Sequence, residues 1–176
     1  PVGRFLQELR GESSESLSHS KTLVCEALGR GKLDKAQFGV FLPSYLFQRR
    51  EIPPHQLFNR IRDVVLECER LEYHSVWLDD HLMLRNNPIL ECWTTLAALA
   101  AASTRIRLGT MVTATAFRNP ALLAKMASTV DVISGGRVEF GIGSGVQKQE
   151  HEAYGYQFPD TPARTRRMKE AIEIIK

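Results

Sequence analysis

Four short apolar runs recur at intervals through most of the chain. They occupy residues 38–42, 75–78, 106–112 and 138–142 and are rich in aliphatic, β-branched and aromatic side chains. Runs of this length and composition predict β-strands. The apolar residues follow one another instead of alternating with polar ones. We therefore expect both faces of each strand to be buried, as in a parallel sheet.

Segments with helical periodicity separate the four runs. Apolar residues three and four positions apart predict a helix over Gln56–Glu72, and an Ala- and Leu-rich run predicts a second, largely buried helix over Glu91–Ala102. Asn119-Pro120 provides an N-cap and a proline at the first helical position, and Gly135-Gly136 ends the helix that follows. A short helical stretch near Gln147–Ala153 precedes a last helix that Thr161-Pro162 opens.

Alternating strands and helices with parallel pairing define the fold class. The pattern predicts an α/β protein, either a doubly wound sheet or a TIM-barrel-like (β/α) architecture, with about four βα units. In both folds ligands bind beyond the carboxyl ends of the strands. These ends are 43–45, 79–81, 111–113 and 143–145.

The first 34 residues differ in character from the rest. They contain five serines between Ser13 and Ser20 and a Gly-Arg-Gly at 29–31. This composition predicts a flexible N-terminal extension over residues 1–34, with one short helix at Leu23–Leu28, ahead of a folded domain over 35–176.

Charge and cysteine content exclude several functional classes. The formal net charge is +3, and the basic residues are dispersed except at 164–169, too few for a nucleic-acid footprint. That cluster is either a solvated helix face or a patch for phosphate or an acidic partner. No apolar run approaches the ~20 residues of a membrane span.

The three cysteines, Cys25, Cys68 and Cys92, lack C-x-x-C spacing. We therefore expect reduced thiols and a cytoplasmic protein, with Cys68 and Cys92 packed in the core.

Asp80 and His81 are the first candidates for chemistry. An imidazole beside a carboxylate at the end of a strand can act as a base or proton relay, because its unperturbed pKa is about 6.5. A loop histidine that binds neighbouring backbone is the alternative. Spacing alone does not separate the two.

Two further stretches at the predicted rim have open interpretations. The glycines in residues 141–145 let the backbone approach a phosphate or a flat ring, or they form a tight turn. The Thr-rich stretch 110–115 lines a ring-binding wall or is an ordinary strand. The five histidines show no metal-ligand spacing, so we expect no metal site.

From residue 35 to 176 the chain resembles the bacterial luciferase-like family of flavin- and coenzyme F420-dependent oxidoreductases, most of all its deazaflavin branch. The blocks that match, in family order, are Phe38-Gly-Val-Phe-Leu-Pro, Ser75-Val-Trp-Leu-Asp-Asp-His, Ile106-Arg-Leu-Gly-Thr, Arg118-Asn-Pro-Ala-Leu-Leu-Ala-Lys, Val130-Asp-Val-Ile-Ser-Gly-Gly-Arg-Val-Glu-Phe-Gly-Ile-Gly and Ala153-Tyr-Gly. The resemblance implies a TIM-like barrel with the ring of F420, or alternatively FMN, at the carboxyl rim.

The resemblance also implies roles for individual residues. Asp80 and His81 match the Asp-His of the family, with His81 in proton transfer or substrate orientation. Met111-Val112 match a position where family members often have a cis peptide bond behind the ring. The residues expected to contact the cofactor are Asp79, Thr110, Met111, Val112, Gly143, Ser144, Gly145 and Gln149. Val146 stands where one branch has a glutamate for acid catalysis, which argues against a sugar-phosphate dehydrogenase.

A complete barrel needs eight βα units and about 250 residues, so the chain corresponds to an amino-terminal half. Half a barrel leaves two strand edges open. We expect the chain to be either a truncated product or one that a second copy or another partner completes. The resemblance implies hydride transfer between F420 or FMN and a small organic substrate. The alternatives are an FMN-dependent monooxygenase and a non-catalytic half-barrel that serves as a folding or interaction unit.

Overall fold

The computed structural model describes residues 36–44, 52–84 and 88–176. The chain divides into two compact units, Pro1–Phe38 and Gly39–Lys176, and the site lies entirely within the second. The predicted extension at 1–34, its short helix and Cys25 lie outside the described residues.

The second unit is built on parallel strands. β1 (Gly39–Leu42), β2 (Ser75–Leu78), β3 (Arg107–Thr110) and β5 (Val138–Glu139) form one sheet in the order β1-β2-β3-β5, and all three pairings are parallel. β4 (Thr113–Ala114) pairs in parallel with β6 (Ile142–Gly143). The α/β class and the parallel βα repeats predicted from the apolar runs are therefore confirmed.

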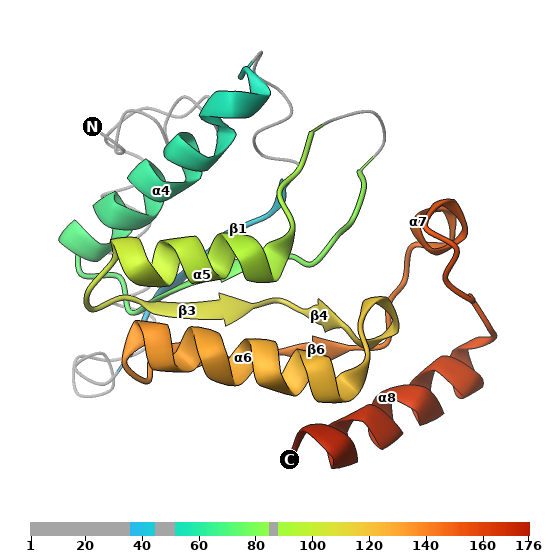
Figure 1. The fold of residues 1–176 in the computed structure, drawn as a ribbon. Coiled ribbons are helices and arrows are strands. Elements are labelled where there is room, and N and C mark those ends of the chain that lie inside the picture. The colour runs from blue at the N-terminus through green and yellow to red at the C-terminus, as the bar shows by residue number, and fades with distance from the viewer. Residues whose placement is uncertain (1–35, 45–51, 85–87) are drawn as a thin grey trace. The chain divides into compact units, whose positions relative to one another are not determined.

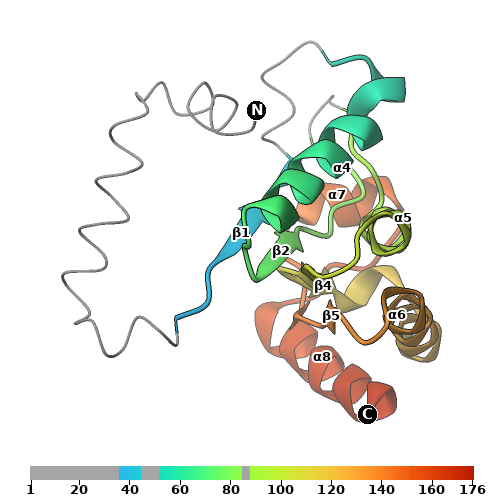
Figure 2. The ribbon, with the colours of Figure 1, turned by 90° about the vertical axis from the view of Figure 1, so that its left-hand side faces the viewer.

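The helices alternate with the strands as predicted. Their bounds are α4 (Pro54–Arg70), α5 (Cys92–Ala102), η2 (Thr115–Phe117), α6 (Pro120–Ser134), α7 (Lys148–Ala153) and α8 (Thr161–Ile175). The Asn119 side chain caps α6 by accepting from the backbone N–H of Ala121, and Gly135 ends it with a φ of 70°. α4, α5 and α6 lie on the same side of the strands (Figure 2), and α8 runs beside α6 (Figure 1).

The register assigns different residues to the two faces of the sheet. Val76 and Leu108 are paired neighbours with no exposed surface, in a row that packs against the helices. Phe41, Trp77 and Gly109 form the adjacent row, which strand alternation directs to the opposite face. The Trp77 indole lies across Gly109, where an added Cβ would be 2.3 Å from the ring. Gly109 therefore makes room for the indole.

Two predicted strands are each interrupted near their carboxyl ends. The strand predicted over 106–112 ends at Thr110 as β3, and β4 follows this run at Thr113–Ala114. The strand predicted over 138–142 forms β5 and contains only the first residue of β6. The Thr110 hydroxyl explains the break, since it donates to the carbonyl of Gly141 (2.7 Å) and accepts from the N–H of Gly141 (3.0 Å). The Thr110 hydroxyl thus bonds the backbone of Gly141 in place of a backbone group of the neighbouring strand.

Cys68 and Cys92 are buried free thiols in the core, as predicted. Burial raises the pKa of Cys68 to about 11 and that of Cys92 well above its usual value, so both thiols stay protonated. Within the described part of the chain, no helix combines the length and the apolar character needed to cross a membrane.

Candidate functional site

A cavity of about 210 Å³ lies at the carboxyl rim of the strands. One side is polar and consists of Asp79, Asp80, His81 and Glu150. The rest of the lining is apolar side chains and the backbone of a glycine-rich turn: Met111, Val112, Ala114, Phe117, Val146 and Gly143–Gly145. An apolar cavity with a few polar groups at one end is the usual form of a site for a small organic molecule.

The apolar wall follows the break between β3 and β4. The peptide bond between Met111 and Val112 is cis, at the position that the resemblance implies, and both side chains are nearly half exposed. Gly143 faces Val112 so closely that an added Cβ would be 2.6 Å from Cγ2. Gly145 has a φ of 77°, and its Cβ would be 2.9 Å from the imidazole of His151. Glycine at both positions keeps this wall flat.

His81 pairs with a carboxylate from a distant part of the sequence. Its Nδ1 is 3.1 Å from Oε2 of Glu150, which lies on α7 and is only 3% exposed. Glu150 also accepts from the backbone N–H groups of Leu82 and Met83. The hydrogen bond with Glu150 raises the pKa of His81 against the opposing effect of burial. For Glu150, burial favours the neutral acid, but these hydrogen bonds outweigh it and lower the pKa.

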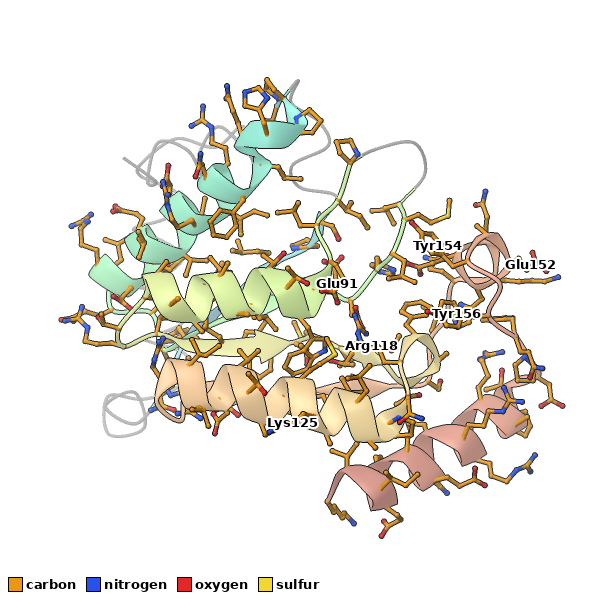
Figure 3. The ribbon with its side chains drawn as sticks, in the orientation of Figure 1. Glu91, Arg118, Lys125, Glu152, Tyr154 and Tyr156 are labelled. Carbon is orange, nitrogen blue, oxygen red and sulfur yellow. The ribbon has the colours of Figure 1, made fainter. Side chains whose placement is uncertain are left out.

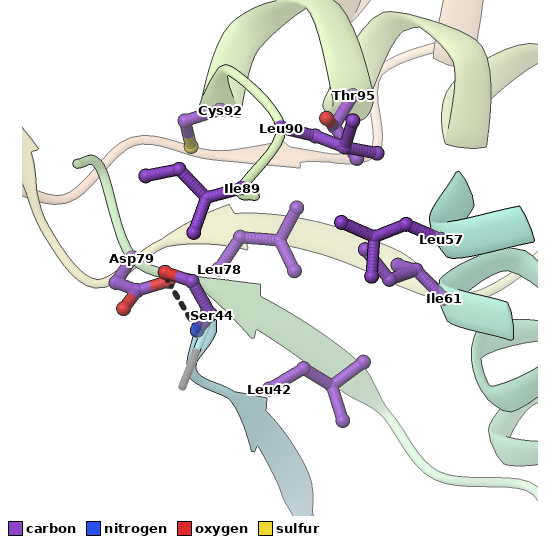
Figure 4. A pocket seen from close by; sticks show the side chains of 10 residues that line it. All are labelled: Leu42, Ser44, Leu57, Ile61, Leu78, Asp79, Ile89, Leu90, Cys92 and Thr95. Carbon is purple, nitrogen blue, oxygen red and sulfur yellow. Dashed lines mark hydrogen bonds between the residues drawn. The ribbon is translucent and has the colours of Figure 1, made fainter. Parts of the chain in front are cut away.

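Asp79 is oriented by the end of β1. Its Oδ1 accepts from the backbone N–H (2.9 Å) and the hydroxyl (2.7 Å) of Ser44 (Figure 4). Its Oδ2 lies 3.9 Å from Nε2 of His81. A small second cavity behind Asp79, between the sheet and the helices α4 and α5, is lined mainly by Leu42, Leu57, Ile61, Leu78 and Ile89. Asp79 therefore has apolar packing behind it and His81 in front.

Asp80 makes a different set of contacts. Its side chain is fully buried and accepts two hydrogen bonds from Arg118 (2.6 and 2.9 Å) and one from the N–H of Ala114 (2.9 Å). Arg118 also donates to Glu91, the N-cap of α5 (Figure 3). Burial lowers the pKa of Arg118, but the two carboxylates outweigh it and raise the pKa. The carboxylate that Asp80-His81 was expected to provide for the imidazole is instead Glu150, because the short Asp80 side chain is held by Arg118.

Some of the other predicted contact residues line the cavity and some do not. Met111, Val112, Ser144 and the flanking glycines all line the cavity. Thr110 is fully buried and binds Gly141, so it supports the wall from behind. Gln149 is exposed on α7 and is absent from the cavity lining, which contains its neighbour Glu150 instead.

Glu150 and Arg118 are the main residues that sequence reasoning missed. No local pattern marks Glu150, because α7 has only six residues and its periodicity does not fix the buried side. Arg118 directly precedes the N-cap Asn119, where a cation has no favourable helix-dipole interaction. That position indicates a tertiary partner for its charge.

A larger cavity of about 490 Å³ adjoins the first. Ser144 lines both, and the second is also lined by Tyr156, Arg164, Arg167 and Glu170. Arg167 donates to the side-chain oxygen of Gln157 (2.8 Å) and remains exposed. The cluster at 164–169 thus contributes two guanidinium groups to a cavity beside the rim.

Within residues 36–44, 52–84 and 88–176, no group of three or more His, Cys, Asp and Glu side chains has the geometry to hold a metal ion.

Comparison with protein families matches residues 36–176 to the luciferase-like monooxygenases. The chain belongs to this family. An F420-dependent glucose-6-phosphate dehydrogenase of Amycolatopsis mediterranei (strain U-32) is 32% identical over 124 residues, which are 65% of this chain and 37% of the relative. Monooxygenase RslO1 of Streptomyces bottropensis superimposes with a TM-score of 0.69 at 25% identity, covering 80% of this chain and 42% of that one.

Both FMN and F420 occur in solved proteins that share this fold: the oxygenating constituent of 3,6-diketocamphane monooxygenase of Pseudomonas putida, solved with FMN, superimposes with a TM-score of 0.69 at 21% identity and covers 79% of this chain and 38% of that one. An F420-dependent secondary alcohol dehydrogenase, solved with an F420-acetone adduct, superimposes with a TM-score of 0.62 at 26% identity and covers 79% of this chain and 40% of that one. The chain thus spans about two fifths of the length of these luciferase-like proteins, and the fold is part of their TIM-barrel-like architecture.

Proposed function

We propose that the rim cavity binds the ring of reduced F420, with FMN as the alternative, and that the site supports hydride transfer to a small organic substrate. When bound, such a ring supplies the hydride chemistry, and the protein binds and orients it. The observation that carries the proposal is one cavity in which the Met111-Val112 wall and the turn Gly143–Gly145 meet the His81–Glu150 pair.

The cavity residues fit a planar heterocycle. Met111, Val112 and Val146 are 44%, 45% and 75% exposed and present apolar surface to a ring face. Gly143 belongs to the same wall and packs against Val112 with no Cβ between them, and its backbone also lines the cavity. Asp79 and His81 supply polar partners for the ring edge or for the substrate.

The neighbouring cavity suits a negatively charged group attached to the ring. Arg164 and Arg167 lie there, and Ser144 joins the two cavities. Guanidinium groups bind phosphate and carboxylate through paired N–H donors. Arg164 already donates to the carbonyl of Pro159 and the hydroxyl of Thr161, and Arg167 donates to Gln157. An anionic part of the cofactor that extends past Ser144 must therefore exchange these contacts.

Val146 limits the substrate class. It lines the cavity, and its apolar side chain provides no proton there. Val146 therefore argues against a sugar phosphate whose oxidation depends on a carboxylic acid at this position, and we propose another small organic substrate.

Fluorescence titration tests the proposal. Purified chain is mixed with F420 and, separately, with FMN, and the quenching of cofactor fluorescence is followed. Micromolar binding of either one is expected, with F420 the tighter of the two. Val146→Trp, which fills the open cavity with an indole, should weaken binding at least tenfold, while Val132→Trp on the 81% exposed outer side of α6 should not. Absence of binding to both cofactors would refute the proposal.

A second candidate function is that of a non-catalytic half-barrel that associates through its sheet. The observation in its favour is Phe41, which is 38% exposed and which strand alternation directs to the face opposite the helices. Light scattering should then show a dimer that Phe41→Glu converts to monomer. A monomeric wild-type chain would exclude this function.

A further inference from the structure

The two nitrogens of the His81 ring have different surroundings. Nδ1 is in hydrogen-bonding distance of Glu150 at 3.1 Å, whereas Nε2 is 3.9 Å from Asp79, beyond hydrogen-bonding distance, and the ring lines the cavity. Glu150 reaches His81 from α7, 69 residues later in the sequence. The ring is thus held at one nitrogen and open at the other.

The orientation of Glu150 is fixed independently of His81. Its Oε1 accepts from the backbone N–H groups of Leu82 and Met83, so Oε2 is the oxygen directed at the imidazole. An ionised carboxylate only accepts hydrogen bonds. The nitrogen facing Glu150 must therefore be the protonated one.

We propose that Glu150 is a positioning residue that holds neutral His81 in the Nδ1–H tautomer and thereby makes Nε2 the atom that exchanges a proton at the cavity. When the ring acts as a base, Nε2 takes a proton and Nδ1 keeps its own, and the reverse transfer leaves the lone pair on Nε2. Glu150 stabilises the cation formed in this exchange and stays ionised throughout. The identity of the ligand that exchanges this proton depends on the proposed function. The assignment of the tautomer depends only on the contact with Glu150.

The surrounding charges act in the same direction. Among the residues that the structure describes, Asp79 and Asp80, at the end of β2, and Glu150, on α7, are the acidic groups near the ring, and all three favour the imidazolium. The nearby cation in this described part, Arg118, is directed at Asp80 and Glu91. Lys148 and Glu152, the other charged residues of α7, pair with each other on its exposed side.

Glu150→Gln separates positioning from simple support of the fold. The amide oxygen can still accept from Leu82 and Met83, so the contact between α7 and this loop is kept. The amide nitrogen then faces Nδ1 as a donor, which forces Nδ1 to accept and moves the proton to Nε2. A residue with only a structural role would leave the tautomer unchanged.

Two-bond ¹H–¹⁵N spectra of the ¹⁵N-labelled full chain, recorded from pH 5 to 9, report the tautomer and pKa of each histidine. Wild-type His81 should show the Nδ1–H form and a pKa above that of a free imidazole. In Glu150→Gln it should show the Nε2–H form and a pKa lowered by about 1 unit through loss of the adjacent charge. Glu152→Gln, on the exposed side of α7, is the matched control and should leave both readings unchanged.

An Nε2–H tautomer in the wild-type protein would overturn the proposal without reference to any variant. So would a Glu150→Gln protein in which the tautomer and pKa of His81 stay at their wild-type values. These spectra need no cofactor. If the tautomer changes as expected but neither F420 nor FMN binds, the positioning role stands and the proposed function falls.

Discussion

Two carboxylates at opposite ends of the strands each accept hydrogen bonds from the backbone of a distant loop. Glu69, near the end of α4, accepts from the backbone N–H groups of Thr104, Arg105 and Ile106, which lead into β3. Glu150 accepts from two backbone N–H groups that follow β2. Each carboxylate thus fixes a loop that is far away in the sequence.

The two carboxylates differ in their remaining partner. Glu69 binds the hydroxyl of Thr104 (3.0 Å), whereas Glu150 binds the imidazole of His81. Burial raises the pKa of Glu69, but the backbone N–H groups outweigh it and bring the pKa to about 2. The amino end of the sheet therefore keeps a permanent structural anion, while the carboxyl rim couples its anion to a group that titrates near neutral pH. The second arrangement places a titratable imidazole beside the rim cavity.

Removing the cation at the carboxyl rim should have the largest effect on stability. Arg118→Met leaves the buried Asp80 without its ion-pair partner, and such a loss lowers the free energy of unfolding by about 3–5 kcal/mol. Urea unfolding at pH 7 measures it, with Arg60→Met on the exposed side of α4 as the control. A change below about 1 kcal/mol would show that Asp80 does not depend on Arg118.

Breaking the anchor at the amino end should come next. Glu69→Ala leaves three backbone N–H groups without their carboxylate and should lower the free energy of unfolding by about 2–3 kcal/mol. Glu69→Gln retains one acceptor oxygen and should lose about half as much. The neighbouring Glu72→Gln serves as control in the same urea experiment. Equal stability of Glu69→Ala and wild type would contradict this assignment.

Loosening the rim without altering His81 should have a smaller effect. Tyr154→Phe removes the hydrogen bond to the carbonyl of Leu82 and should lower the free energy of unfolding by about 0.5–1.5 kcal/mol. Amide exchange should quicken at Leu82 and Met83, while Thr104 and Arg105 keep their wild-type rates. Faster exchange at all four residues would mean that the two ends are not independent.

The smallest expected effect is a pH dependence that distinguishes the two ends. The pKa of His81 is raised in the folded protein, so its contribution is full below about pH 6.5 and falls as the pH rises through the folded pKa. The pKa of Glu69 is lowered, so its contribution is full above about pH 4.5 and is lost toward pH 2. The stability difference between wild type and His81→Ala should therefore be larger at pH 6 than at pH 8. A difference independent of pH would refute the coupling at the rim.

Much of this architecture could be predicted from local sequence. The apolar runs located the strands, and Asn119 and Gly135 marked the ends of α6, because these signals depend on neighbouring residues. The strand breaks at Thr110 and Gly141 could not be located in this way, since they depend on a hydroxyl that bonds across 31 residues.

The site shows the same limit. His81 and Met111 follow strand ends, were predicted from topology together with the family resemblance, and line the cavity. Gln149 was predicted as a contact residue and Glu150 was not, because the contact of Glu150 with His81 depends on the phase of a six-residue helix and on a partner 69 residues away. Short helices give too few turns for periodicity to fix their buried side.

Binding of a flavin or deazaflavin ring beside His81 can be located by adding F420 or FMN to ¹⁵N-labelled chain and following the imidazole signals. His74, which lines a separate cavity with Glu69, and His55, exposed near the start of α4, are internal references. Saturable shifts of His81, with His74 and His55 unchanged, are the predicted result. Binding that leaves His81 unchanged would contradict a ring site at the carboxyl rim.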